Sequence, residues 1–121
     1  MHWEIDLCLR VVSGGWDLLY DPAIVVDHYP AQRFGEDQRV GRPLPALQNE
    51  VYNETRALLR NLPAWRGAIT LCYGVAIGTR LAPGLVTALE RRLRGERVGP
   101  RLAAAERARL EALGDLIRRP A

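Results

Sequence analysis

Lysine is absent from this sequence, and all 17 basic residues among its 121 residues are arginines. Arginine codons are rich in G and C, so this bias indicates a GC-rich genome and no particular chemistry. Cysteine is scarce: Cys8 and Cys72 lie far apart in apolar surroundings, without the spacing of metal ligands. They predict reduced thiols in the core of a cytosolic protein rather than a disulfide framework or a zinc site.

The sequence also lacks an apolar run long enough to cross a bilayer. The longest run, residues 68–78, falls short of the ~20 residues that a spanning helix needs, and Arg80 and Pro83 interrupt its continuation. A buried helix is therefore the first interpretation of this region, an interfacial helix with Trp65 and Arg66 at one end the second, and a transmembrane helix the third. With 48% hydrophobic and 26% charged residues, the chain fits one soluble globular domain.

Charge is divided unevenly along the chain. Residues 1–62 carry 6 arginines against 9 acidic residues, a net charge of −3, whereas residues 63–121 carry 11 against 5, a net charge of +6. A basic half of this kind faces nucleic acid, faces an anionic membrane, or is a solvated helix surface. No aromatic residues alternate with the arginines at positions 91, 92, 94 and 97, so we expect no nucleic-acid partner.

Residues 3–13 follow a helical pattern. Their apolar positions recur at helical spacing and form one face: Ile5, Cys8, Leu9 and Val12. Asp6 and Arg10 stand four residues apart on another face, which is the spacing of a helical ion pair. Gly14 and Gly15 follow, and glycine readily takes the left-handed conformation that ends a helix.

Residues 16–28 are rich in aromatic and β-branched side chains. They predict two short strands, 16–20 and 23–28, or one bent strand, with the break at Asp21 and Pro22. Two strands alone make a marginal sheet, so these two require partner strands.

Helices are predicted for most of the remaining chain. A loop is expected at 31–44, followed by helices at 45–62 and 64–82. After a break at Pro83 and Gly84, a short helix would end at about residue 94. A hinge at 95–100 and an amphipathic helix at 101–118 follow. The first of these helices presents one apolar face: Leu47, Val51, Thr55, Leu58 and Leu62. The last presents one apolar stripe: Leu102, Leu110, Leu113, Leu116 and Ile117.

Residues 3–28 resemble the C-terminal part of the catalytic domain in bacterial family-2 glycosyltransferases, which have the nucleotide-binding GT-A fold. The family pattern reads roughly E-D-x-D-L-x-x-R, then a glycine-ended helix, then a strand of the form y-x-P-x-a-x-v-x-H. Here EIDLCLR (residues 4–10) matches from the second acid onward, and Gly14-Gly15-Trp16 matches the helix end. LYDPAIVVDH (residues 19–28) matches the strand.

The downstream sequence resembles C-terminal extensions of such enzymes. NET (residues 53–55), LLRNLP (58–63) and GTRLAPG (78–84) resemble an ordered N-x-T…LL-x-x-L-P…G-T-R-x-x-P-G run. The resemblance covers about residues 3–95. It implies an α/β fragment that is mostly helical, with a helix–strand–strand piece of a GT-A-type domain followed by a bundle of three to four helices.

This organisation divides the chain into four parts. The end of the catalytic domain would occupy residues 1–30 and a loop residues 31–44. A helical extension would follow at residues 45–94, and the hinge with its C-terminal helix at residues 95–121.

The resemblance also implies roles for individual residues. Glu4 occupies the position of the second acid, which is the expected general base that takes the proton from the acceptor hydroxyl. Asp6 and Arg10 would support the helix that carries this base. His28 would be a ligand to the divalent metal, Mg²⁺ or Mn²⁺, that holds the diphosphate of the nucleotide-sugar donor. Trp3 stands where the family pattern has its first acid.

The nucleotide-binding half of such an enzyme has no counterpart in this sequence. No D-x-D motif occurs, and no βαβ unit precedes residue 4. We therefore expect the C-terminal part of an inverting glycosyltransferase that acts on a hydroxyl acceptor of cell-envelope polysaccharide or lipid-linked type, inactive as this chain alone. Its location would be cytoplasmic or at the inner face of the membrane.

A missing half would leave apolar side chains of the N-terminal region in water, so we expect dimerisation through that face or poor order there. The alternative function is a small helical binding or scaffold protein. Its basic C-terminal face would contact nucleic acid or a membrane surface.

Overall fold

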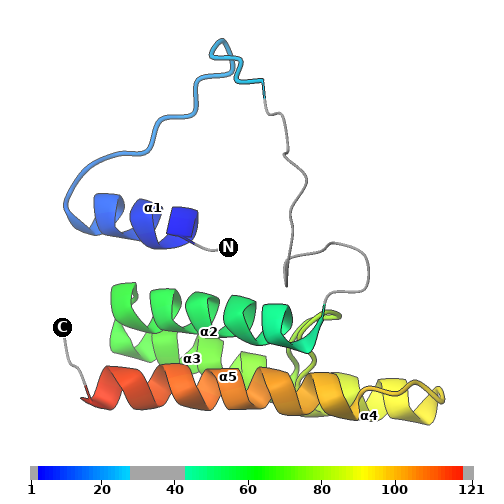
Figure 1. The fold of residues 1–121 in the computed structure, drawn as a ribbon. Coiled ribbons are helices and arrows are strands. Elements are labelled where there is room, and N and C mark those ends of the chain that lie inside the picture. Colours follow the sequence, from blue (N-terminus) through cyan, green and yellow to red (C-terminus); the bar gives the residue numbers. More distant parts are fainter. Residues whose placement is uncertain (1–2, 28–42, 119–121) are drawn as a thin grey trace.

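The computed structural model describes residues 3–27 and 43–118. This part of the chain contains five helices, which Figure 1 shows: α1 (Trp3–Ser13), α2 (Leu44–Asn61), α3 (Ala64–Ala76), α4 (Leu85–Leu93) and α5 (Gly99–Arg118). Prolines and glycines set most of the helix ends. Pro43 and Pro63 directly precede α2 and α3. Gly15 and Gly95 follow α1 and α4 with φ angles of 84° and 82°.

The predicted strands are wrong, and with them the α/β fold class. No described residue belongs to a β-sheet, and this part of the chain is a helical bundle rather than a helix–strand–strand piece. Residues 16–27 follow α1 as an irregular segment with a local turn, in which Ala23 N donates to Asp21 Oδ1 at 2.9 Å. A strand needs a neighbour for its backbone N–H and C=O groups, and no described segment supplies one. The Leu19 side chain is accordingly 91% exposed.

The helices α2 and α5 form the largest interface of the bundle and run parallel. Gln48 Nε2 donates to Glu111 Oε2 at 3.3 Å, and Tyr52 OH donates to Asp115 Oδ2 at 2.6 Å. Both pairs are separated by 63 positions, so the two helices advance in the same direction, as Figure 1 shows. The helix α3 runs back beside them after the break at Pro63.

The buried core lies between α2 and α5. Leu47 and Val51 of α2 pack against Ala105 and Ala108 of α5, which confirms the start of the apolar face expected on α2. The face expected on α5 is only partly confirmed, since Leu102, Leu113 and Leu116 are half-buried. Its fully buried positions are alanines, namely Ala105, Ala108 and Ala112, whereas Leu110 and Ile117 of the predicted leucine stripe are exposed. Alanine lets the axes of two helices approach closely, because interaxial distance depends on the side chains at the contact.

The helix predicted for residues 64–82 ends early, at Ala76. The chain then makes a tight loop in which Gly78 has a φ of 67° and pairs with Pro83 in an isolated antiparallel bridge. A Cβ at Gly78 would collide with the backbone of Ala82 and Gly84, so this position requires glycine. The loop depends on the pairing of Gly78 with Pro83, five positions apart, which helical periodicity does not reveal.

The cysteines also differ from expectation. Both are free thiols, but Cys8 is half-buried and Cys72 on α3 is exposed, so neither belongs to the core.

The helix α1 packs on α2, on the side that Figure 1 shows above the other helices. Its bounds are those expected, but its apolar face is only partly covered, since Ile5 and Val12 remain exposed. Among the residues that the structure describes, no helix combines the length and apolar character needed to cross a membrane.

Candidate functional site

Asp6 connects α1 to the C-terminal end of α2. Its Oδ1 accepts a hydrogen bond from Asn61 Nδ2 at 2.9 Å, and its Oδ2 lies 3.6 Å from Arg10 Nε. Asn61 Nδ2 also donates to the carbonyl oxygen of Ala57 at 2.8 Å, which fixes the amide on its own helix. Both carboxylate oxygens of Asp6 are therefore occupied within the fold. The i,i+4 pair that the sequence predicted for Asp6 and Arg10 is present.

Glu4, the predicted general base, lies in the first turn of α1, two positions before Asp6. The structure thus places three of the predicted site residues, Glu4, Asp6 and Arg10, on one short helix. His28, the predicted metal ligand, lies outside the described residues.

A metal site was tested against the donor groups that the structure describes. Within residues 3–27 and 43–118, no three side chains of His, Cys, Asp or Glu come together in a way that could hold a metal ion. The implied ligand His28 is not among these residues, and no step proposed below passes through a metal ion.

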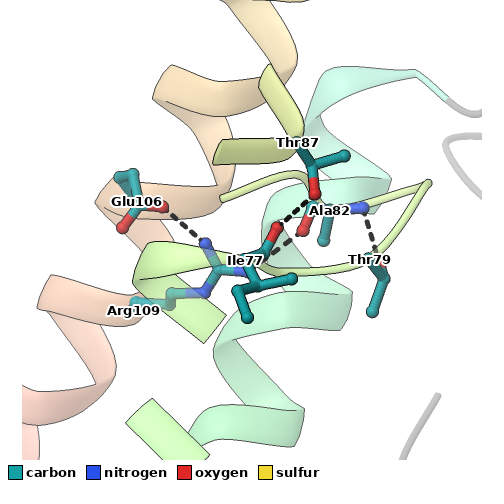
Figure 2. A network of polar contacts seen from close by, with 6 residues as sticks. All are labelled: Ile77, Thr79, Ala82, Thr87, Glu106 and Arg109. Atoms are coloured by element: carbon teal, nitrogen blue, oxygen red, sulfur yellow. Dashed lines mark hydrogen bonds and ion pairs between the residues drawn. The ribbon is translucent and has the colours of Figure 1, made fainter. Parts of the chain in front are cut away.

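A network of polar contacts surrounds the loop between α3 and α4 (Figure 2). Arg109 of α5 donates from Nη1 to Glu106 Oε1 at 2.6 Å and from Nη2 to the carbonyl oxygen of Ala82 at 3.1 Å. Within the loop, Ala82 N donates to Thr79 Oγ1 at 3.0 Å. The carbonyl of Ile77, at the end of α3, accepts from Thr87 Oγ1 at 2.6 Å.

Arg109 is only 6% exposed, and sequence reasoning missed its burial. Its guanidinium passes over Gly74 of α3, where an added Cβ would lie 3.0 Å from Arg109 Nε. The signal that could have revealed it was the position of Arg109 among the alanines of α5, together with a glycine in the middle of α3. Because its charge is paired with Glu106 and it bonds a backbone carbonyl, its role here is to hold the loop against α5.

A pocket of about 150 Å³ lies between α2, α3 and this loop. Apolar side chains such as Leu58, Leu59 and Leu71 form much of its lining, with Glu54 and Arg109 among the polar residues. Tyr73 and three threonines, Thr55, Thr70 and Thr79, also line the pocket, and its described lining includes no histidine or cysteine.

The helix α3 exposes apolar side chains on the face directed away from the core. Trp65 is 61% exposed, Ile69 60% and Tyr73 55%, and they recur every four residues along the helix. The Arg66 guanidinium lies 5.0 Å from the centre of the Trp65 ring, in a cation–π contact.

Comparison with known proteins identified no relatives: no family model, no curated protein and no solved structure matches this chain.

Proposed function

We propose that this chain is the acceptor-side part of an inverting glycosyltransferase, which moves a sugar from a nucleotide-sugar to a hydroxyl acceptor. The proposal rests on the ordered sequence pattern that begins at Glu4 and continues to Pro83. The observation that best supports it is the engagement of Asp6 with Asn61 and Arg10. Because one carboxylate oxygen of Asp6 bonds Asn61 and the other lies beside Arg10, we assign Asp6 a structural role and Glu4 the role of the base.

In this proposal, the Glu4 carboxylate takes the proton from the acceptor hydroxyl while that oxygen attacks the anomeric carbon of the donor. The bond from that carbon to the nucleoside diphosphate breaks on the opposite side, so the configuration inverts and the diphosphate leaves with the bonding electrons. A base needs to be ionised and positioned within hydrogen-bonding distance of the proton that it removes. Asp6 serves as a positioning residue, because its hydrogen bond with Asn61 joins α1 to α2, and Arg10 supports Asp6 from the same helix.

The nucleotide-sugar and its Mg²⁺ or Mn²⁺ ion would be held by a donor-binding unit other than the described helices, which contain no suitable ligand cluster. We place the protein in the cytoplasm, at the inner face of the membrane, where a lipid-linked or polysaccharide acceptor would be accessible.

The test uses the longest open reading frame that contains this chain, with Glu4→Gln compared against Glu54→Gln on α2. Removing a general base lowers kcat about 10²–10⁴-fold, and we expect this for Glu4→Gln with little change in KM. Glu54→Gln should retain parental activity. Transfer by Glu4→Gln at a rate close to that of the parent would eliminate the base assignment.

The second candidate is a helical binding unit without chemistry of its own. The exposed apolar side chains of α3 favour it, since a globular protein that needs no partner seldom leaves one helix apolar on its outer side. If the protein from the complete reading frame transfers no sugar but still binds a partner through α3, the binding function is favoured over the transferase function.

A further inference from the structure

The outer side of α3 is apolar except for Arg66 in its first turn. Its buried side, which includes Gly67 and Gly74, packs on the bundle. The exposed residues include Trp65, Ala68, Ile69, Cys72 and Tyr73 of α3, with Ile77 directly after it, and Tyr73 also lines the pocket. We call these six residues the α3 apolar face. An amphipathic surface helix normally has charged residues on its solvent-exposed side. The α3 apolar face therefore has the character of a surface that another structure covers.

Arginine stands at each end of the α3 apolar face. Arg66 lies in the first turn of α3, and Arg80 lies in the loop that follows the helix. Both are exposed, and within the part of the chain that the structure describes neither forms an ion pair. Residues 63–89 contain no aspartate or glutamate. The face and its surroundings therefore carry positive charge without compensation from their own segment.

We propose that the α3 apolar face docks on an anionic phospholipid surface. The apolar side chains would enter the boundary between headgroups and acyl chains, with α3 parallel to the membrane plane. Trp65 would lie at headgroup depth, where the amphipathic indole is favoured, and Arg66 and Arg80 would contact lipid phosphates. This inference rests on the location proposed above, at the inner face of the membrane, and not on the sugar-transfer step.

Charge and area argue against a second copy of the chain as the occupant. In an antiparallel pair of α3 helices, Arg66 of one copy would meet Arg80 of the other, and in a parallel pair each arginine would meet its equivalent. No acidic residue of the segment is available to separate them. A 13-residue helix is only about 20 Å long, which limits the area that two copies could bury through it.

The experiment measures binding of the complete 121-residue chain to vesicles by co-sedimentation, with phosphatidylcholine alone and with added phosphatidylglycerol. We expect binding to the anionic vesicles, weakening as salt is raised, and little binding to phosphatidylcholine. Ile69→Asp should weaken binding to anionic vesicles about tenfold or more, because it places a charge in the middle of the face. Its control is Leu110→Asp on the exposed side of α5, which should bind like the parent.

The contribution of arginine to vesicle binding is tested with two double variants that have the same net charge. Arg66→Gln with Arg80→Gln should weaken binding about 25-fold, or about fivefold for each arginine. Arg107→Gln with Arg118→Gln, both exposed on α5, should change it much less.

Equal loss in the two arginine pairs, equal binding to both kinds of vesicle, or undiminished binding of Ile69→Asp would overturn the proposal. A dimer in solution that Ile69→Asp converts to a monomer, with no vesicle binding by the parent, would assign the face to a second copy instead. None of these results concerns the transferase, which is tested separately by activity.

Discussion

Arg109 on α5 donates a hydrogen bond to the backbone carbonyl of Ala82, 3.1 Å away in the loop between α3 and α4. A second arginine bonds the same loop, since Arg91 Nη1 donates to the carbonyl oxygen of Arg80 at 2.9 Å. Backbone groups in a tight loop lose their helical partners, and these two side chains supply replacements. The loop is thereby attached to both α4 and α5, although the two carbonyls lie 11 and 27 positions from their arginines in sequence.

Replacing Arg109 should destabilise the bundle. Arg109→Met leaves Glu106 without its ion pair and removes one of the two donors to the Ala82 carbonyl, which also accepts from Thr79 N at 2.9 Å. We expect a loss of about 2–3 kcal/mol in the free energy of unfolding, below the usual range for a buried pair because Glu106 is 22% exposed and remains partly hydrated. Urea unfolding followed by circular dichroism measures it. Arg107→Met, at an exposed position of the same helix, should stay within about 0.5 kcal/mol. Equal midpoints for the two variants would contradict a structural role for Arg109.

Gly78 and Gly95 separate two effects of adding a Cβ. Both have a φ in the left-handed region, but only at Gly78 would the new atom collide with backbone, while at Gly95 nothing lies within 4 Å. Gly95→Ala should therefore reduce stability by about 1 kcal/mol, from conformational strain alone. Gly78→Ala should reduce it by at least about 3 kcal/mol, because the loop backbone has to move. Thermal unfolding of both variants gives the comparison, and similar melting temperatures would refute the collision.

The alanine contact between α2 and α5 predicts a strong dependence on side-chain size. Ala108 is fully buried against α2, and Ala108→Leu should cost about 2–3 kcal/mol, since the larger side chain forces the helices apart. Ala103→Leu, at an exposed position of α5, is the control and should be nearly neutral. Denaturant unfolding measures both. If leucine were tolerated equally at both positions, α2 and α5 would not pack closely through alanine.

The pair Tyr52 and Asp115 predicts a loss of stability at high pH. The hydrogen bond to Asp115 raises the pKa of Tyr52 above its ordinary value of 10.0, with burial acting in the same direction and Arg56 partly opposing. The folded state then holds the phenolic proton at pH values where the unfolded chain has released it. The stabilisation is complete below pH 10.0 and is lost as pH rises through the higher pKa of the folded state.

The measurement is the free energy of unfolding as a function of pH for the parent and Tyr52→Phe. The parent should lose stability more steeply above about pH 10, and the difference between the two proteins should shrink there. Parallel curves from neutral to alkaline pH would show that the hydrogen bond does not favour the protonated phenol.

The sequence determined the helices that depend on local signals. The bounds of α1 and α2 follow from apolar periodicity and from the glycines and prolines at their ends, and the pair of Asp6 and Arg10 follows from the same spacing. These features involve residues within one or two turns of each other, which is why sequence alone predicts them.

Tertiary structure decided everything that depends on partners distant in sequence. Aromatic and β-branched residues at 16–27 predicted strands, but a strand forms only where another strand accepts its hydrogen bonds, and the described chain offers none. The parallel approach of α2 and α5 buried alanines and Arg109 while leaving Leu110 in water. Periodicity identifies an apolar stripe, but the packing of the neighbouring helix determines which side of the helix is buried.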